Sequence, residues 1–180
     1  AVYGVNIPKI TEVLPTNLPV IEANEMRLDN LFRLEDGSIA LVDYESVYKR
    51  RDKIKYLGYI VRTLKRDELL DDSEQMIRMI VIYTGDVKKG TTEAKLNTGC
   101  LQFTVEEVFL SELNGAEIES TLTERIYSEG VLDEEEQMQF VILPLIYAGR
   151  KEKQECIRRC FELAKEIKSP EMQIFLLSGL

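Results

Sequence analysis

The sequence predicts an α/β fold with a helical C-terminal portion. Three observations support this prediction. A strand hairpin, a helix and an apolar run follow one another early in the chain, and from about residue 106 onward only helical patterns follow. The composition, 44% hydrophobic and 31% charged, is that of an ordinary globular protein rather than a disordered one. Strands that alternate with a helix are typical of an α/β core, whereas a run of helices adds a helical portion to it.

The hairpin is expected at the start of this core. Segments 28–34 and 39–45 have the composition of strands, and Glu35-Asp36-Gly37 is a good turn signal between them. A helix is then expected over residues 51–70. Its apolar face is indicated by residues that recur at helical spacing, namely Ile54, Leu57, Gly58, Val61 and Leu64.

The rest of the chain completes the core and adds the helices. The apolar run MIRMIVIYTG (76–85) predicts a strand covered on both faces. A polar loop (86–98) and a strand at 100–105 come next. Helices are expected at 106–113, 117–128, 134–148 and 150–167. We therefore assign residues 1–105 to the α/β core and residues 106–180 to a helical C-terminal region, and we expect both ends of the sequence to be cuts in a longer protein.

Composition limits the function classes. The chain has no histidine, which excludes a zinc site built on imidazole, a Ser-His-Asp triad and a Cys-His dyad within it. The net charge of −9 disfavours nucleic-acid binding unless charge is segregated or metal ions intervene. Three cysteines, no signal peptide and no apolar run of membrane-spanning length predict reduced thiols in the cytoplasm and no membrane partner.

Carboxylates gather where the predicted hairpin ends. Asp43 and Glu45 are two residues apart, so they point to the same face of a strand. Asp29 joins them in one register only. A three-residue turn makes position 34 face 38, and Asp29 then faces Asp43. A two-residue turn makes Asp29 face Tyr44, and its side chain turns to the other face. The sequence allows both registers.

A divalent cation would explain this group of acids. Unpaired like charges on neighbouring strands are destabilising, and hard Mg²⁺ or Mn²⁺ prefers oxygen ligands. Such a metal can activate water and neutralise the charge of a phosphodiester. The competing interpretation is a set of solvent-facing acids at the end of a hairpin. Two features favour the site: Asp43 follows the apolar run 39–42, and the next segment supplies cations, Lys49, Arg50, Arg51, Lys53 and Lys55.

These residues carry a resemblance to a known family. The segment DNLFRLEDGSIALVDYES (29–46), followed by Lys55 and Tyr59 on the helix and by VIYTG (81–85), resembles the bacterial Rpn-like transposase/nuclease family. That family belongs to the PD-(D/E)xK nuclease superfamily, and the resemblance covers about residues 25–105. It implies a restriction-endonuclease-like core with a central mixed sheet flanked by helices. It also implies metal-dependent cleavage of DNA.

The resemblance assigns roles to single residues. Asp29 corresponds to the first metal ligand and Asp43 to the second, while Glu45 occupies the third motif position. Lys55 matches the helix arginine of the family and Tyr59 its helix tyrosine. Members often place a further acidic residue on a helix before the first strand, which implies that the chain lacks an upstream helix of this core.

Two departures from the family pattern affect the chemistry. Asp43 replaces the more usual glutamate, and Glu45 replaces the family's glutamine or the superfamily's lysine. Glu45 is therefore expected to be a metal ligand or a general base. Without a lysine on the strand, the charge of the transition state must be met by the metal or by another cation, and Lys55, reaching in from the helix, is the candidate.

The basic run KRRDKIK (49–55) adjoins the proposed site and would place Arg51 along a phosphate backbone, although such a run is also typical of a solvated helix start. Tyr59 is expected to orient a phosphate or stack on a base, or else to pack at the edge of the core.

The expected function is thus a Mg²⁺- or Mn²⁺-dependent DNA endonuclease, which commonly acts as a homodimer. The alternative is a catalytically inactive nuclease fold that binds other proteins.

Overall fold

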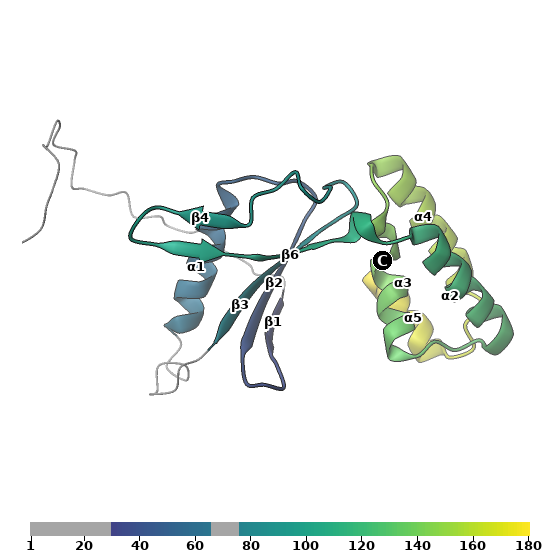
Figure 1. Cartoon of the computed structure of the whole chain (residues 1–180). Coiled ribbons are helices and arrows are strands. Elements are labelled where there is room, and N and C mark those ends of the chain that lie inside the picture. The colour runs from purple at the N-terminus through teal and green to yellow at the C-terminus, as the bar shows by residue number, and fades with distance from the viewer. Residues whose placement is uncertain (1–29, 66–75) are drawn as a thin grey trace, which may run out of the picture.

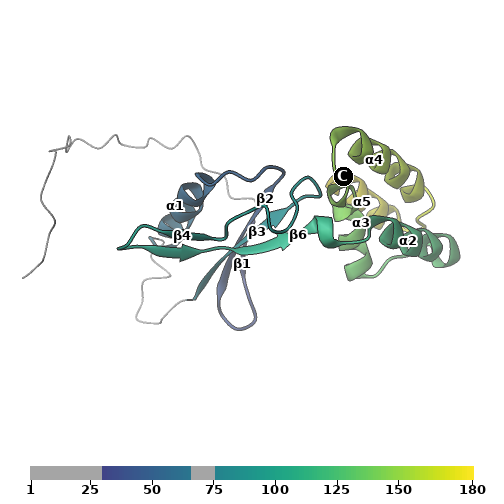
Figure 2. The same cartoon turned by 45° about the horizontal axis from the view of Figure 1, so that its top comes forward.

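The computed structural model describes residues 30–65 and 76–180, which form two regions (Figure 1). The α/β region comprises residues 30–65 and 76–109 and contains the sheet. The helical region comprises residues 110–180 and lies beyond the end of the sheet, as Figure 2 shows from a second direction. The fold is therefore α/β with a mixed central sheet flanked by helices.

The central sheet has four strands in the order β1-β2-β3-β6. Strand β1 runs antiparallel to β2, whereas β2, β3 and β6 are parallel. A separate antiparallel pair, β4 and β5, lies between β3 and β6 in the sequence. The strand bounds are Asn30–Arg33 (β1), Ile39–Glu45 (β2), Ile77–Tyr83 (β3), Lys95–Asn97 (β4), Gln102–Thr104 (β5) and Glu106–Phe109 (β6).

The hairpin adopts the register with a three-residue turn. Asn30 pairs with Val42 and Arg33 with Ile39, and the Leu34 N–H donates to the Ser38 carbonyl at 2.8 Å. Gly37 takes a φ of 82°, the left-handed conformation that the turn requires of it. This is the register on which the carboxylate site depends. Asp29 itself lies outside the described residues.

The helix after the hairpin, α1 (Asp52–Leu64), packs on one face of the sheet, but its buried face is not its apolar stripe. Lys53, Tyr56 and Tyr59 are among its buried residues, and the two tyrosines join the core of the α/β region. Ile54 is 56% exposed and Val61 47%. The apolar stripe therefore faces outward, because tertiary contacts with the sheet select the aromatic face instead.

The helix expected over residues 106–113 does not form. Residues 106–109 instead form β6, which extends the parallel sheet beside β3, and a short 3-10 turn, η2 (Leu110–Glu112), follows. Backbone pairing with the exposed edge of β3 outweighs the helical pattern of these few residues. The loop expected at 86–98 also contains a strand, β4, at its end.

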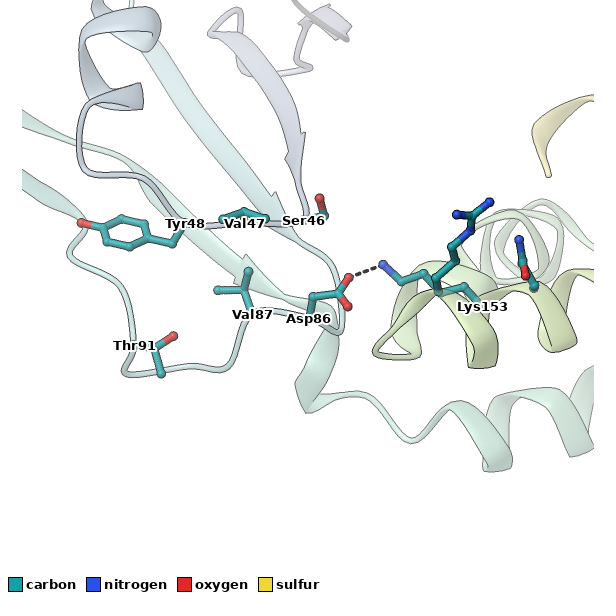
Figure 3. Close-up of a pocket in the computed structure, with 9 residues that line it drawn as sticks. Ser46, Val47, Tyr48, Asp86, Val87, Thr91 and Lys153 are labelled. Carbon is teal, nitrogen blue, oxygen red and sulfur yellow. Dashed lines mark hydrogen bonds and ion pairs between the residues drawn. The ribbon is translucent and has the colours of Figure 1, made fainter.

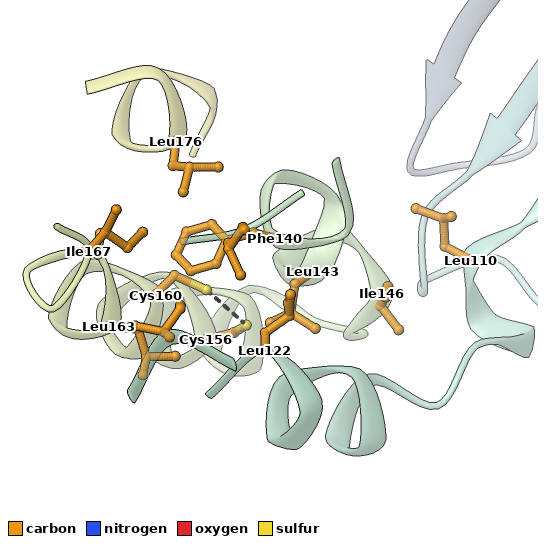
Figure 4. Packing of buried hydrophobic residues seen from close by; sticks show 13 residues of the cluster. Leu110, Leu122, Phe140, Leu143, Ile146, Cys156, Cys160, Leu163, Ile167 and Leu176 are labelled. Atoms are coloured by element: carbon orange, nitrogen blue, oxygen red, sulfur yellow. Dashed lines mark hydrogen bonds between the residues drawn. The ribbon is translucent and has the colours of Figure 1, made fainter. Parts of the chain in front are cut away.

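The helical region contains four helices, α2 (Gly115–Glu129), α3 (Glu134–Ile146), α4 (Arg150–Ala164) and α5 (Pro170–Gly179). The acidic run before α3 begins that helix as expected: Asp133 and Glu136 form a capping box. Helix α5 was not predicted. These helices enclose an apolar core around Phe140, which is fully buried (Figure 4). Across the described residues, no helix combines the length and the apolar composition that crossing a bilayer requires.

The two regions meet at the end of β3. The Gly85 N–H donates to the Leu145 carbonyl of α3 at 2.7 Å. A Cβ atom at position 85 would overlap with the Ile146 carbonyl, so the backbone can approach this closely only because residue 85 is glycine. The end of the sheet is therefore in direct backbone contact with the last turn of α3.

Candidate functional site

The centre of the candidate site is the carboxylate of Asp43. This residue is only 3% exposed, because it lies on the face of β2 that α1 covers, in line with Ile39 and Leu41. Glu45 follows two residues later on the same face and is half-buried. A buried carboxylate needs charge and hydrogen-bond partners, so its surroundings decide what it can do.

Lys55 bridges the two acids. Its Nζ lies 2.5 Å from Asp43 Oδ2 and 2.5 Å from Glu45 Oε1. The lysine comes from the first half of α1, and 32% of its side chain is exposed, so the group opens to the surface at this point. The structure thus brings together three of the residues that the sequence singled out, from β2 and α1.

The charge state of Lys55 follows from this contact. Burial lowers the pKa of the Lys55 ammonium, but the hydrogen bonds and negative charges of Asp43 and Glu45 outweigh burial and raise this pKa above its ordinary value. Lys55 is therefore a cation at neutral pH. It can stabilise negative charge, but it cannot act as a base.

The tyrosines of α1 support the site from within. The Tyr56 hydroxyl lies 3.4 Å from Glu45 Oε1, and the Lys55 Nζ lies 5.8 Å from the centre of the Tyr59 ring. Burial, together with the charge of Glu45, raises the pKa of Tyr56, so its hydroxyl remains a donor. Tyr59 is only 6% exposed and belongs to the core. Arg51 lies at the N-terminal cap of α1 with an exposed side chain.

Asp43 and Glu45, both in contact with Lys55, are the carboxylates of the candidate site among the described residues. Within residues 30–65 and 76–180, no three or more acidic or thiol side chains group so that they could hold a metal. Asp29, the expected third ligand, lies outside these ranges. Mg²⁺ is usually held by one or two carboxylates and keeps several waters, so the chemistry of Asp43 and Glu45 fits such an ion.

A cavity of about 700 Å³ lies near the end of β2, although neither Asp43 nor Glu45 lines it (Figure 3). It begins at Ser46, the residue after Glu45, and lies at the carboxyl ends of β2 and β3, the edge where open α/β sheets bind ligands. The start of α4 forms its other wall. The residues that line it are Ser46, Val47, Tyr48, Asp86, Val87, Thr91, Arg150, Lys153 and Gln154.

Asp86 joins the two walls of this cavity. Its carboxylate forms an ion pair with Lys153 and accepts hydrogen bonds from the Gly149 N–H (2.7 Å) and the Thr84 hydroxyl (2.9 Å). Burial raises the pKa of Asp86, but these partners outweigh it and hold the pKa below its ordinary value. Asp86 is therefore an anion that fixes α4 against the end of the sheet.

Asp86, Arg150 and Lys153 are not among the residues that the sequence predicted for the site. The segment YTGD (83–86) gave a partial signal, since a small residue and an acid directly after a buried strand are typical of a functional turn.

A scan against models of protein families found no match, and neither did searches of curated proteins and of solved structures. The functional argument therefore depends on the residues and their geometry.

Proposed function

We propose that this chain is a metal-dependent DNA endonuclease with a PD-(D/E)xK-type core. The observation that supports this proposal most is the contact of one lysine ammonium with two carboxylates, Asp43 and Glu45, at the carboxyl end of the central strands. Two acids and a lysine are the side-chain types that the nuclease superfamily uses. Here the lysine comes from α1 rather than from the strand, and Asp29, the first acid of the family pattern, lies outside the described residues.

The side chains would divide the work as follows. Asp43 and Glu45 would hold a Mg²⁺ or Mn²⁺ ion, which supplies an activated water and neutralises phosphate charge when bound. Lys55 would stabilise the negative charge that develops on the phosphodiester, a role for which its raised pKa keeps it protonated. Tyr56 would hold Glu45 in place through its hydroxyl. The partner would be DNA, the setting the cytoplasm and the assembly a homodimer.

A second function is favoured by a specific observation. Lys55 already forms an ion pair with each of the two acids, and the chain carries a net charge of −9. An ion-pair cluster of this kind can stabilise a fold without any metal, as would be expected of an inactive nuclease fold that binds other proteins.

Metal titration separates the two functions. Mn²⁺ is titrated into the full chain by calorimetry, beside an Asp43→Asn variant, which keeps the size of the side chain and removes its charge. The nuclease proposal expects binding by the parent and loss of binding in the variant, followed by Mg²⁺-dependent cleavage of plasmid DNA by the parent alone.

The matched control is Glu106→Gln. Glu106 is also a strand carboxylate in an ion pair, with Arg78, but it lies outside the site, and its loss should leave Mn²⁺ binding unchanged. If the parent binds no Mn²⁺, or if Glu106→Gln weakens binding as much as Asp43→Asn does, the ion-pair cluster is structural and the second function stands.

A further inference from the structure

We propose that the cavity between the end of the sheet and α4 binds one nucleotide unit of the DNA strand, with Arg150 as the phosphate ligand. This inference rests on the proposed nuclease function and extends it to the helical region. It assigns a substrate-binding role to residues that the resemblance does not cover.

The position of the cavity is the first argument. Ser46 lines it and directly follows Glu45, so the cavity begins one residue beyond the strand that carries both acids, although neither acid lines it. The Thr84 N–H also donates to the Glu45 carbonyl at 3.0 Å, and the Thr84 hydroxyl donates to Asp86, which lines the cavity. A volume of about 700 Å³ is within the usual range for sites that hold small organic ligands.

The charges of the wall are the second argument. Lys153 is compensated by Asp86, as Figure 3 shows, so it contributes little net charge. Arg150 also lines the cavity, and it forms no ion pair with any residue in the part of the chain that the structure describes. An arginine in this setting suits a phosphate, because its planar fork can donate two parallel hydrogen bonds to phosphate oxygens.

The remaining lining residues match the rest of a nucleotide. Tyr48 adds an aromatic ring at the end of the cavity that points away from α4 (Figure 3), and Lys53 at 5.0 Å and the edge-on ring of Tyr83 hold it in place. Bases stack on such rings without regard to sequence. Ser46, Thr91 and Gln154 add hydroxyl and amide groups of the kind that contact sugar and phosphate in protein–DNA complexes.

Lys151 provides a matched control for Arg150. It is the next residue on the same helix turn and carries the same charge, but its side chain is 90% exposed, forms a surface ion pair with Glu155 and does not line the cavity. If only overall charge matters, Lys151→Ala and Arg150→Ala should weaken DNA binding equally. If the cavity is the site, only Arg150→Ala should do so.

The test measures binding of a short fluorescein-labelled oligodeoxythymidine to the full chain by fluorescence anisotropy, with EDTA and separately with Ca²⁺. We expect Arg150→Ala to weaken binding by on the order of tenfold or more, as for a lost hydrogen bond to a charged group. The slope of log affinity against log salt should fall by about 0.7, the value for one phosphate contact on a single strand. Val47→Glu, which adds an acid at a lining position that is 54% exposed, should weaken binding as well.

The outcomes separate this inference from the proposed function. Equal effects of Arg150→Ala and Lys151→Ala, or no binding by the parent under either condition, would overturn the cavity site. Competition by free thymidine monophosphate at the same strength as by the oligonucleotide would also overturn it, in favour of a free nucleotide as the ligand. Arg150-dependent DNA binding by a parent that takes up no Mn²⁺ would instead support the cavity and contradict the nuclease.

Discussion

The two regions of the molecule differ in what they bury. The buried polar and charged residues among the described parts of the chain all belong to the α/β region: Ser38, Asp43, Lys53, Thr63 and Thr84. Across residues 110–180 the buried side chains are apolar or cysteine, as around Phe140 in Figure 4. Burying a polar group costs free energy unless it is paired. The comparison teaches that the α/β region keeps groups that packing alone would not select, whereas the helical region is built mainly for packing and supplies a wall of the cavity.

The largest effect is expected in the core of the helical region. Phe140→Ala should lower the free energy of unfolding by about 4 kcal/mol, because the ring is fully buried and a cavity remains. Urea denaturation followed by circular dichroism measures it. Phe32→Ala is the control, since that ring is 49% exposed on β1 and its loss should cost about 1 kcal/mol or less. Equal losses would contradict the burial of Phe140 in the core of the helical region.

The contact between the regions comes next. Gly85→Ala should destabilise the protein by about 3 kcal/mol, because the added methyl group overlaps with the backbone of α3. Gly90→Ala separates this overlap from backbone strain. Its φ is 83° but no atom lies within 4 Å of the added Cβ, so only about 1 kcal/mol of conformational strain is expected. A similar cost for both variants would mean that the regions do not meet closely at Gly85.

Removing the cation of the site should have a pH-dependent effect. Lys55→Met should lower the free energy of unfolding by about 2 kcal/mol at pH 7. Breaking a fully buried ion pair costs roughly 3–5 kcal/mol, and a smaller loss is expected here because the lysine side chain is 32% exposed. Without Lys55 the like charges of the two acids repel each other, so the deficit in the free energy of unfolding should shrink as the pH falls and carboxylates are protonated.

In the parent protein, Lys55 makes the free energy of unfolding depend on pH in the alkaline range, where stability falls as the pH rises. Its raised pKa means that its contribution to stability is fully present below its ordinary value of 10.5 and is lost as the pH rises through the pKa of the folded state. Urea denaturation of parent and variant at several pH values measures both effects. A deficit that stays constant from pH 7 to 4 would show that Lys55 does not compensate buried charge.

The ion pair that fixes α4 should matter less. Asp86→Asn should cost about 1 kcal/mol at pH 7, since the pair is partly exposed and the amide keeps some hydrogen bonds. The lowered pKa of Asp86 means that its contribution is present above the ordinary value of 3.8 and is lost as the pH falls through the pKa of the folded state. Thermal melts of parent and variant should therefore converge at acid pH, and a gap that persists there would contradict this assignment.

The smallest effect is expected on the apolar stripe of α1. Ile54→Ala should change stability by less than about 0.5 kcal/mol, because the side chain is 56% exposed. Tyr59→Ala on the buried face of the same helix should cost about 3 kcal/mol. Chemical denaturation of both variants tests which face packs on the sheet, and a reversed order would mean that the stripe is buried after all.

The sequence predicted the elements of the α/β region better than their contacts. Strand β2 formed over the expected residues, since its apolar run and turn residues agree. Residue spacing indicated an apolar face for α1, but it could not show that the face with Tyr56 and Tyr59 packs on the sheet instead of that apolar face. Residues 106–109 formed a strand because the edge of β3 offers backbone partners, a contact that no local pattern contains.

The candidate site shows the same limit. Lys55 is 12 residues from Asp43 and 10 from Glu45 in the sequence. Strand alternation and helix spacing were therefore enough to predict that the three residues lie together. The cavity combines Asp86 with Lys153, which is 67 residues away. Such a pairing depends on how α4 packs at the end of the sheet, and a single sequence does not contain that information.

The hydrogen bond from Gly85 also makes one proton a reporter for the whole molecule. Its amide donates to the Leu145 carbonyl, so it is shielded from exchange with solvent only while β3 and α3 are both folded and in contact. If the helical region opened away from the sheet while each part stayed folded, this amide would exchange while the amides within β3 and α3 remained protected. Its protection from exchange therefore reports how readily the wall that carries Arg150 separates from the strands that carry the acids.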